Sequence, residues 1–247
     1  MKQKALFCGY LNSGIFLETI VASLLALDIS SRDGGHIYAE TDFSRCIVEP
    51  YNASSAFLFV IMAAYWLWRL KGRYDRHTFL TSAITLLTIG AVGGTIYHAF
   101  RIHAFFMYMD WLPILIICLM TSVYFLDKII GVWYYALGIV GLAFLMQFLL
   151  FRFVEDKNVI NLNYAIMGSI VLVPTLLILI KHRFFEWWWV IYALFAFMLA
   201  LFFRISDHWK ILPMGTHFLW HCFGAAAGHF MFLFIYRLNR KDFEGIH

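Results

Sequence analysis

TSAITLLTIGAVGGTIYHAFRIHAFFMYMDWLPILIICLMTSVYFL, residues 81–126, contains two long apolar runs separated by one short polar junction. Each run belongs to a stretch of the ~20 helical residues that cross a hydrocarbon core of ~30 Å. No water satisfies free backbone groups inside lipid, so we expect helices here rather than open strands. The junction nevertheless carries His98 and Asp110, although ionisable side chains are costly at membrane depth. The stretch therefore predicts two successive membrane helices with a functional site near the point where they meet.

The whole chain has the composition of a membrane protein. Of its 247 residues 62% are hydrophobic and only 14% are charged, against roughly 25% charged residues in ordinary soluble domains. The net charge of +4 does not indicate nucleic acid as a partner, because the basic residues stand singly or in short clusters between apolar runs, as in the loops of membrane proteins. The expected partners are a bilayer and a lipid. The four cysteines show no CxxC pairing, which argues against a zinc ribbon or a disulfide scaffold.

Seven apolar stretches are long enough to span a bilayer. They cover residues 52–70, 78–100, 106–126, 130–151, 159–180, 186–204 and 216–236. The sequence thus predicts an all-α, polytopic membrane protein whose seven-transmembrane helix bundle forms one domain over residues 31–241. An additional N-terminal hydrophobic helix is expected within residues 1–30, where Asn12, Gly14 and Glu18 interrupt the apolar run. This segment is an extra span, an interfacial helix or a signal-like segment.

The lysines and arginines predict the orientation of the bundle. One basic cluster, residues 69–76, follows the first predicted span, and a second, residues 237–241, follows the last. Both clusters are expected in the cytoplasm by the positive-inside rule, which makes the C-terminus cytoplasmic. The end of the second span and the starts of the third and seventh then lie together on the non-cytoplasmic side. These three helix ends share one side of the membrane because the number of crossings that precede each of them has the same parity, whichever side that is.

Three histidines fall at that shared membrane depth. His217 and His221 are four residues apart, so they share one helical face with Cβ atoms ~6 Å apart, and His98 closes the second span. Three nitrogen ligands with a fourth position open are typical of catalytic zinc. A single histidine at a helix end more often contacts head groups or a carbonyl, but Asp110 lies at the same level and favours a metal site. His229 lies ~12 Å deeper and is expected to contact a neighbouring helix.

A second polar group precedes the first predicted span. Carboxylates and an amide gather within HIYAETDFSRCIVEPYN, residues 36–52, namely Glu40, Asp42, Glu49 and Asn52. Such oxygen ligands suit calcium, which takes six to eight of them. Their spacing alone favours a solvated acidic loop over a metal site.

Four motifs resemble the alkaline ceramidases and their wider superfamily, which includes the adiponectin and progestin receptors and the GPI-anchor remodelling proteins. They are EPYNASSAF before the first span, AVGGTIYH ending the second, MDWLP opening the third and HFLWH opening the seventh. The resemblance covers residues 36–236. No single motif is decisive, but their order and placement together are fairly specific.

The resemblance implies a zinc ion held by His98, His217 and His221, with Asp110 beside the water that the zinc activates. It also implies a calcium site that uses Glu40, Asp42 and Glu49, to which the cluster above adds Asn52.

The chain departs from the family pattern at three places. Gly94 stands where a serine is expected, and Thr95, rotated by about 100° around the helix, is the candidate for the missing hydroxyl. The spacing from His98 to Asp110 is one residue longer than in ceramidases. Ala39 stands where many members have cysteine, so the disulfide that some of them form in this region is not expected.

The function implied is zinc-dependent hydrolysis of the amide bond of ceramide or a related N-acyl sphingoid lipid. An ester hydrolase in GPI-anchor or phospholipid remodelling would share the site and the fold. A lipid-sensing seven-helix receptor would share the metal site but would signal through a partner. A haem protein would place histidine pairs across the bundle, whereas two of these histidines share a single turn, which favours a small metal ion.

Overall fold

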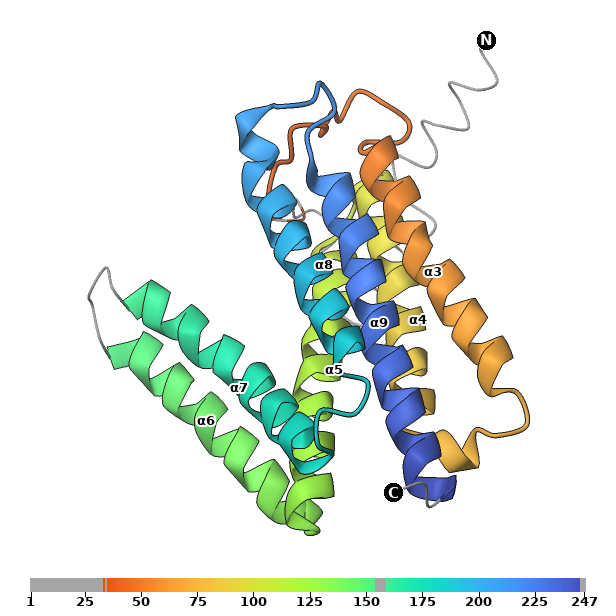
Figure 1. The fold of residues 1–247 in the computed structure, drawn as a ribbon. Coiled ribbons are helices and arrows are strands. Elements are labelled where there is room, and N and C mark those ends of the chain that lie inside the picture. The colour runs from red at the N-terminus through yellow and green to blue at the C-terminus, as the bar shows by residue number, and fades with distance from the viewer. Residues whose placement is uncertain (1–32, 34, 154–158, 245–247) are drawn as a thin grey trace, which may run out of the picture. The chain divides into compact units, whose positions relative to one another are not determined.

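The computed structural model describes residues 33, 35–153 and 159–244 (Figure 1). Within these ranges the chain forms seven α-helices and two short 3-10 helices, and it forms no strand. They are α3 (Pro50–Leu70), η1 (Asp75–His77), α4 (Thr78–Phe100), α5 (Ala104–Ile130), α6 (Trp133–Phe153), α7 (Val159–Lys181), α8 (Trp187–Ile205), η2 (Ser206–Trp209) and α9 (His217–Glu244). The predicted all-α class is therefore confirmed for the described chain.

Each predicted span corresponds to one α-helix in the described ranges. Five helical segments in the described ranges are long and apolar enough to cross a membrane: Pro50–Leu70, Asp75–Phe100, Ala104–Ile130, Trp187–Trp209 and His217–Asp242. Helices α6 and α7 contribute the shorter apolar stretches Trp133–Met146 and Gly168–Lys181. The count of seven crossings is thus not confirmed. The helix expected in residues 1–30 lies outside the described residues.

The chain divides into two compact units. The first comprises the described residues up to Ile114 and those from Trp188 onward, and the second comprises Leu115–Trp187. In the first unit α3 packs against both α4 and α9, around fully buried side chains that include Trp66, Ile84 and Phe234. In the second unit α6 packs against α7, where Ala136, Val140 and Ile170 are buried with Leu126. The single domain over residues 31–241 stays a prediction.

Glycines allow α4 and the first turns of α5 to approach closely. A Cβ atom on Gly93 would lie 2.2 Å from the Cβ of Met109, and one on Gly94 would lie 2.1 Å from Oδ1 of Asp110. Side chains larger than hydrogen would therefore push the two helices apart or displace the carboxylate. The two glycines bring Asp110 against the same helix that carries His98.

Asp207, in η2, fixes the start of α9. Its Oδ1 accepts hydrogen bonds from the backbone N–H groups of Thr216, at 2.7 Å, and His217, at 2.9 Å. These groups have no partner within the helix, so an acidic side chain both satisfies them and complements the helix dipole. The other oxygen, Oδ2, accepts the N–H of Ala39 at 2.9 Å. Asp207 thus joins the loop before α3 to the first residue of α9.

Candidate metal centre

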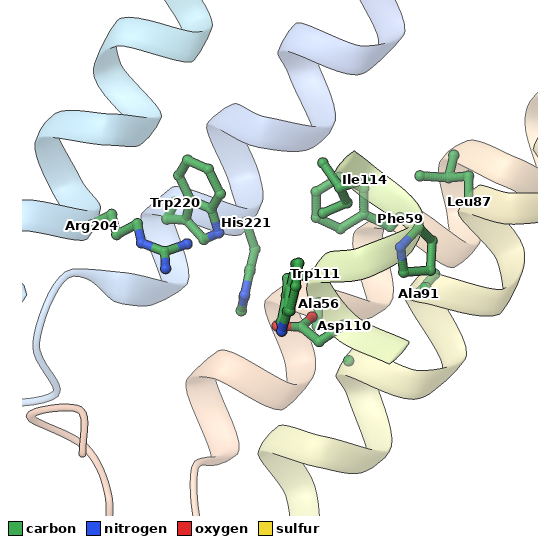
Figure 2. A pocket seen from close by; sticks show the side chains of 13 residues that line it. Ala56, Phe59, Leu87, Ala91, Asp110, Trp111, Ile114, Arg204, Trp220 and His221 are labelled. Carbon is green, nitrogen blue, oxygen red and sulfur yellow. The ribbon is translucent and has the colours of Figure 1, made fainter. Parts of the chain in front are cut away.

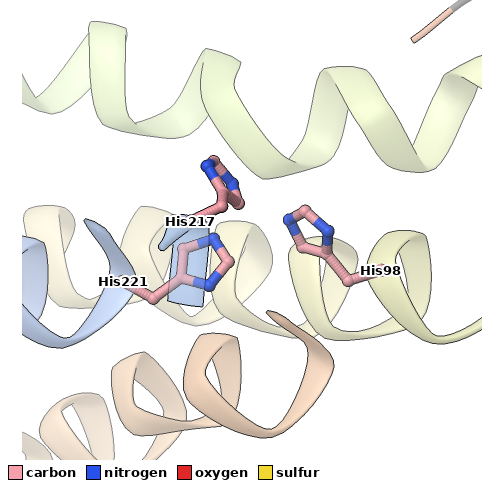
Figure 3. Close-up of side chains that lie close together, drawn as sticks. All are labelled: His98, His217 and His221. Carbon is pink, nitrogen blue, oxygen red and sulfur yellow. The ribbon is translucent and has the colours of Figure 1, made fainter. Parts of the chain in front are cut away.

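His98 from the last turn of α4 meets His217 and His221 from the first turns of α9 (Figure 3). One ring nitrogen of each residue lies within 4.8 Å of the others. The ring centroid of His221 lies 4.8 Å from the ring centroid of His98 and 4.8 Å from that of His217. All three side chains are buried, with at most 2% of each residue exposed. The structure therefore brings His98 together with two histidines that lie more than a hundred positions later in the sequence.

The hydrogen bonds of these histidines leave their inward nitrogens free for a ligand. Nδ1 of His98 lies 2.6 Å from Oε2 of Glu49, and Nδ1 of His221 lies 2.8 Å from Oγ of Ser55. The Nε2 atoms of both rings, and both nitrogens of His217, are buried without a hydrogen-bond partner. Leaving buried polar atoms unpaired costs about 1–3 kcal/mol each. A metal ion among the rings would satisfy one orphaned nitrogen on each.

The donor set suits zinc or a similar borderline-soft cation. Three imidazoles with a fourth position left for water or substrate form a frequent catalytic zinc site. A Zn–N distance of about 2.0–2.1 Å in a tetrahedral site places the nitrogens about 3.3 Å apart, so the rings would draw together on binding. The histidines therefore fit a metal ion in number, chemistry and burial.

A network of buried charged side chains contacts His98. The guanidinium of Arg101 donates to Oε1 of Glu49 at 2.5 Å and holds Asp33 through two bonds of 2.5 and 2.9 Å. Thr41 donates to the same oxygen of Glu49 at 2.6 Å. Carboxylates that accept the outer N–H of a ligating histidine fix its tautomer and ring orientation. Glu49 is therefore a positioning residue for His98, and Arg101 with Asp33 positions Glu49.

The pKa shifts of Glu49 and Arg101 in this network are consistent with their positioning roles. Burial acts to raise the pKa of Glu49, but the hydrogen bond and charge of His98, together with Thr41 and Arg101, outweigh it, so the pKa lies below its ordinary value. Burial likewise opposes the charge of Arg101, yet Asp33 and Glu49 hold the pKa of the guanidinium above its ordinary value. Both groups stay charged at neutral pH, and their opposite charges compensate each other inside the protein.

An aromatic ring from the loop before α3 covers the histidines. Tyr38 stacks on His217 with ring centroids 3.8 Å apart and an interplanar angle of 26°, and it lies 5.5 Å from the ring of His98. Because His217 has no hydrogen bond through its ring, its ring is oriented by this stacking together with its contacts with the rings of His98 and His221. The loop is held in place through Ala39, the residue that Asp207 binds.

Asp110 lies beside the histidines and lines a pocket (Figure 2). Its Oδ2 is 3.8 Å from Nε2 of His98, and about a quarter of the side chain is exposed. The pocket has about 470 Å³ of empty space including its open mouth. Its walls include Phe59, Trp111 and Trp220, and His221 lies among them. The arrangement places one carboxylate and one candidate metal ligand in a largely apolar pocket, which suits a lipid ligand.

The hydroxyl of Thr95 is engaged elsewhere. It donates to the carbonyl oxygen of Ala91 in its own helix at 2.7 Å, and Thr95 does not line the pocket, whereas Gly94 does. The position where a serine was expected is therefore next to Asp110 and carries no side chain. A catalytic role for Thr95 stays a prediction and would require that hydrogen bond to break.

Of the four residues predicted for calcium, Asn52 contacts both Glu40 and Glu49, and a calcium ion held by the four stays a prediction. Glu40 accepts the N–H groups of Tyr51 and Asn52 at the start of α3, and burial raises its pKa. Asp42 is exposed and bonds Ser44 and Arg45 nearby. Asn52 donates through its side chain to Glu49 at 3.3 Å. The oxygens of Glu40 and Glu49 thus already accept hydrogen bonds from other protein groups.

The described cysteines differ in their bonding. Cys46, in the region before α3, is disulfide-bonded, and this bond does not involve the family position occupied by Ala39. Cys118 and Cys222 are free.

Sequence reasoning missed several residues that support the site: Asp33, Tyr38, Ser55, Arg101 and Asp207. Ser55 lies six residues after Glu49, and both positions stand within the quoted motif EPYNASSAF. Arg101 could have been identified from the sequence, because it is a charged residue that directly follows an apolar span. Tyr38 lies in a loop and Asp207 in the short 3-10 helix η2, and in segments this short no periodicity indicates which way a side chain points. His229 contacts Tyr65 and Trp66 of α3, as expected for a residue deeper in α9.

Comparisons with protein-family models, curated proteins and solved structures find no match for this chain. They identify no family, so the resemblance to the alkaline ceramidases rests on the four motifs. What stands independently is a helical protein with five membrane-length apolar helices and a buried cluster of three histidines that could hold a metal ion.

Proposed function

We propose that the protein is a membrane-embedded, zinc-dependent amidohydrolase that cleaves the amide bond of ceramide or a related N-acyl sphingoid lipid. The observation that carries the proposal is the set of buried, unpartnered nitrogens of His98, His217 and His221 next to Asp110 and an apolar pocket. The four motifs shared with the ceramidases support it. The products would be a sphingoid base and a fatty acid.

The chemistry requires an activated water and a proton acceptor. Zinc at the three histidines would supply a Lewis acid that lowers the pKa of water toward ~7 and polarises the amide carbonyl. Asp110 would accept the proton of the attacking water, because its carboxylate is the acidic group in the pocket. The hydroxyl joins the acyl carbon, the carbon–nitrogen bond breaks, and Asp110 returns the proton to the departing amine.

The apolar walls of the pocket explain why the substrate would be a lipid. Phe59, Leu87, Trp111 and Ile114 present carbon surface beside Asp110, and all belong to helices of membrane length. Acyl and sphingoid chains bury apolar surface against such walls, and the few polar groups fix the position of the head. The walls also limit access of bulk water to the reacting bond.

Two other functions use the same site. An ester hydrolase of GPI-anchor or phospholipid remodelling would need the same histidines and the same carboxylate. A lipid-sensing receptor would need the metal site but no proton acceptor, and the placement of Asp110 3.8 Å from His98 favours a hydrolase. Calcium is a less favoured second cofactor, because the oxygens of Glu40 and Glu49 already have protein partners.

The proposed orientation places the metal centre on the non-cytoplasmic side and the C-terminus in the cytoplasm. It rests on the basic residues after α3 and at the end of α9.

The decisive experiment combines metal analysis of the purified protein with mass-spectrometric detection of fatty acid released from a panel of ceramides and phospholipids. We expect about one zinc per chain and release from an amide lipid. His217→Ala should lose both the zinc and the release, whereas His208→Ala, an exposed histidine of η2, should keep both. Undiminished hydrolysis by His217→Ala would contradict the proposal, and release from esters alone would favour the ester hydrolase.

A further inference from the structure

Arg204, in the last turn of α8, is a cation in the pocket beside the metal centre, near enough to Asp110 for their charges to interact but not hydrogen-bonded to it. It lines the same pocket as Asp110 and His221. Within the part of the chain that the structure describes, no hydrogen bond or ion pair joins its guanidinium to another group. Its contact is with Trp220, whose ring centroid lies 5.1 Å from Cζ of Arg204. A charge on an apolar, membrane-length helix is costly and by default marks a functional position.

The stacking on Trp220 determines what Arg204 can bind. The indole ring of Trp220 attracts the guanidinium of Arg204 through a cation–π contact, and the N–H groups of the guanidinium remain available. Figure 2 shows Arg204 and Trp220 extending into the space that His221 and Asp110 also border. A planar fork of N–H donors held in this way recognises two oxygens of a phosphate or a carboxylate at once.

The position of Arg204 along the helix indicates which part of a lipid it meets. The residue is one position from the end of α8, at the level where α9 begins and α4 ends, and it is exposed. Helix ends lie at the depth of lipid head groups, whereas acyl chains lie deeper. An anionic group bound here would therefore belong to the head of the lipid and would lie close to the bond that the centre cleaves.

We propose that Arg204 binds a phosphate on the head group of the substrate, so that the substrate class is an anionic, phosphate-bearing N-acyl lipid rather than neutral ceramide. This specificity rests on the proposed hydrolase function, but the binding of phosphate does not depend on hydrolysis. The phosphate supplies the hydrogen-bonded partner that Arg204 lacks, and the apolar pocket receives the chains.

Binding is measured first, without any reaction. Dodecyl phosphate, dodecanoate and dodecanol are added at equal mole fraction to the purified protein in neutral maltoside micelles, and binding is followed by tryptophan emission and by thermal shift. We expect dodecyl phosphate to bind most tightly. Arg204→Gln should weaken that binding about tenfold or more, the loss expected for a charge-assisted pair of hydrogen bonds. The affinity of Arg204→Lys for dodecyl phosphate should lie between those of the wild type and Arg204→Gln, because lysine keeps the positive charge but lacks the planar set of N–H donors.

The control removes an equal charge at the same end of the first unit. Lys210 follows η2 and does not line the pocket, so Lys210→Gln should bind dodecyl phosphate as the wild type does. Zinc content, measured in every variant, reports whether the centre is intact. Equal binding of dodecyl phosphate by wild type and Arg204→Gln would overturn the proposal. Tighter binding of dodecanoate would assign Arg204 to the released fatty acid and would also overturn it.

Hydrolysis then separates this proposal from the proposed function. N-octanoyl ceramide and its 1-phosphate present the same amide with and without the phosphate. We expect kcat/KM of the wild type to favour the phosphate form by about tenfold or more, and Arg204→Gln to lose that preference. Arg204-dependent phosphate binding without cleavage of any amide would remove the amidase and keep the phosphate site. Cleavage that is equal for both lipids would keep the amidase and remove the phosphate site.

Discussion

Arg101 occupies a backbone conformation that arginine rarely adopts. It caps α4 in the left-handed region, with φ of 52°, where glycine is the usual residue because a Cβ there is strained. The strain is offset by its ion pairs with Asp33 and Glu49. Arg101 is buried next to the histidine cluster despite this unfavourable backbone conformation. This indicates that its side chain has a role at the site.

Arg101→Gly separates the side chain from the backbone. Glycine relieves the strain at this position, so the helix cap should persist, but Glu49 loses the cation that positions it. We expect the affinity for zinc to fall by about 10–100-fold, as is usual when the partner of a ligating histidine is disturbed. Competition with a metal-sensitive dye measures the affinity. An unchanged affinity in a folded variant would show that Arg101 does not position His98 through Glu49.

Gly94→Ala tests the placement of the Asp110 carboxylate. The new Cβ would lie 2.1 Å from Oδ1 of Asp110, so the carboxylate must move away from the histidines. Loss of a positioned proton acceptor typically costs 10²–10⁴ in rate, and we expect fatty acid release to fall by about 100-fold while zinc is retained. The matched change Gly228→Ala, in α9, meets only the flexible end of Met62 from α3 and should keep the rate. Unaltered release by Gly94→Ala would exclude Asp110 as the proton acceptor.

At this scale the sequence predicted the convergence of the histidines but not what holds them. Two histidines one turn apart on a helix share a face for geometric reasons, and the parity of the crossings places His98 at their level. The roles of Glu49 and Arg101 depend on long-range contacts that no local pattern encodes. The carboxylates before the first span predicted a calcium site, which stays a prediction, and the structure adds the guanidinium of Arg101 as a partner of Glu49.

At the scale of secondary-structure elements, the start of α9 requires a glycine at position 215. Gly215 has a φ of 74°, and a Cβ there would lie 2.3 Å from Oδ1 of Asp207 and 2.7 Å from the Cβ of Ala39. The residue therefore needs both the left-handed conformation and the absence of a side chain. The turn it forms brings the N–H groups of Thr216 and His217 onto Asp207.

Gly215→Ala should consequently disturb the helix start and the ligands together. We expect a loss of more than about 1 kcal/mol in stability from the left-handed conformation alone, together with weaker zinc binding, because His217 is the first residue of α9. Thermal unfolding and zinc titration of the same sample measure both effects. Gly72→Ala, a left-handed glycine with no atom within 4 Å of the added Cβ, should lose stability but keep its zinc affinity. Equal zinc affinities in the two variants would contradict the link between this turn and the site.

The helices themselves were predictable, since long apolar runs between short charged segments leave few alternatives in a bilayer. Their ends were accurate to a few residues. What the sequence could not predict is the path of the loop before α3, where Tyr38 reaches the histidines and Ala39 reaches Asp207. Such contacts join positions more than 160 residues apart, so they follow from tertiary packing rather than local preference.

For the whole molecule, the metal ion would connect α4 to α9, two helices from distant parts of the chain. A ligand that binds only the folded state stabilises it by about 2.7 kcal/mol at a concentration of 100 times its Kd. We expect the melting temperature to rise with added zinc and to fall with a chelator. His217→Ala should melt at the same temperature with and without zinc. A zinc-dependent shift that survives in this variant would place the ion elsewhere.

The separation of the ligands along the chain has a consequence for biogenesis. His98 is synthesised and inserted well before the ribosome reaches the segment that carries its two companions. A nascent chain therefore presents a solitary imidazole, which holds metal poorly, until the final hydrophobic segment described here docks beside α3. A metal ion held by the three histidines would therefore bind late in maturation, and a chain arrested before that docking would leave the membrane insertion machinery without it.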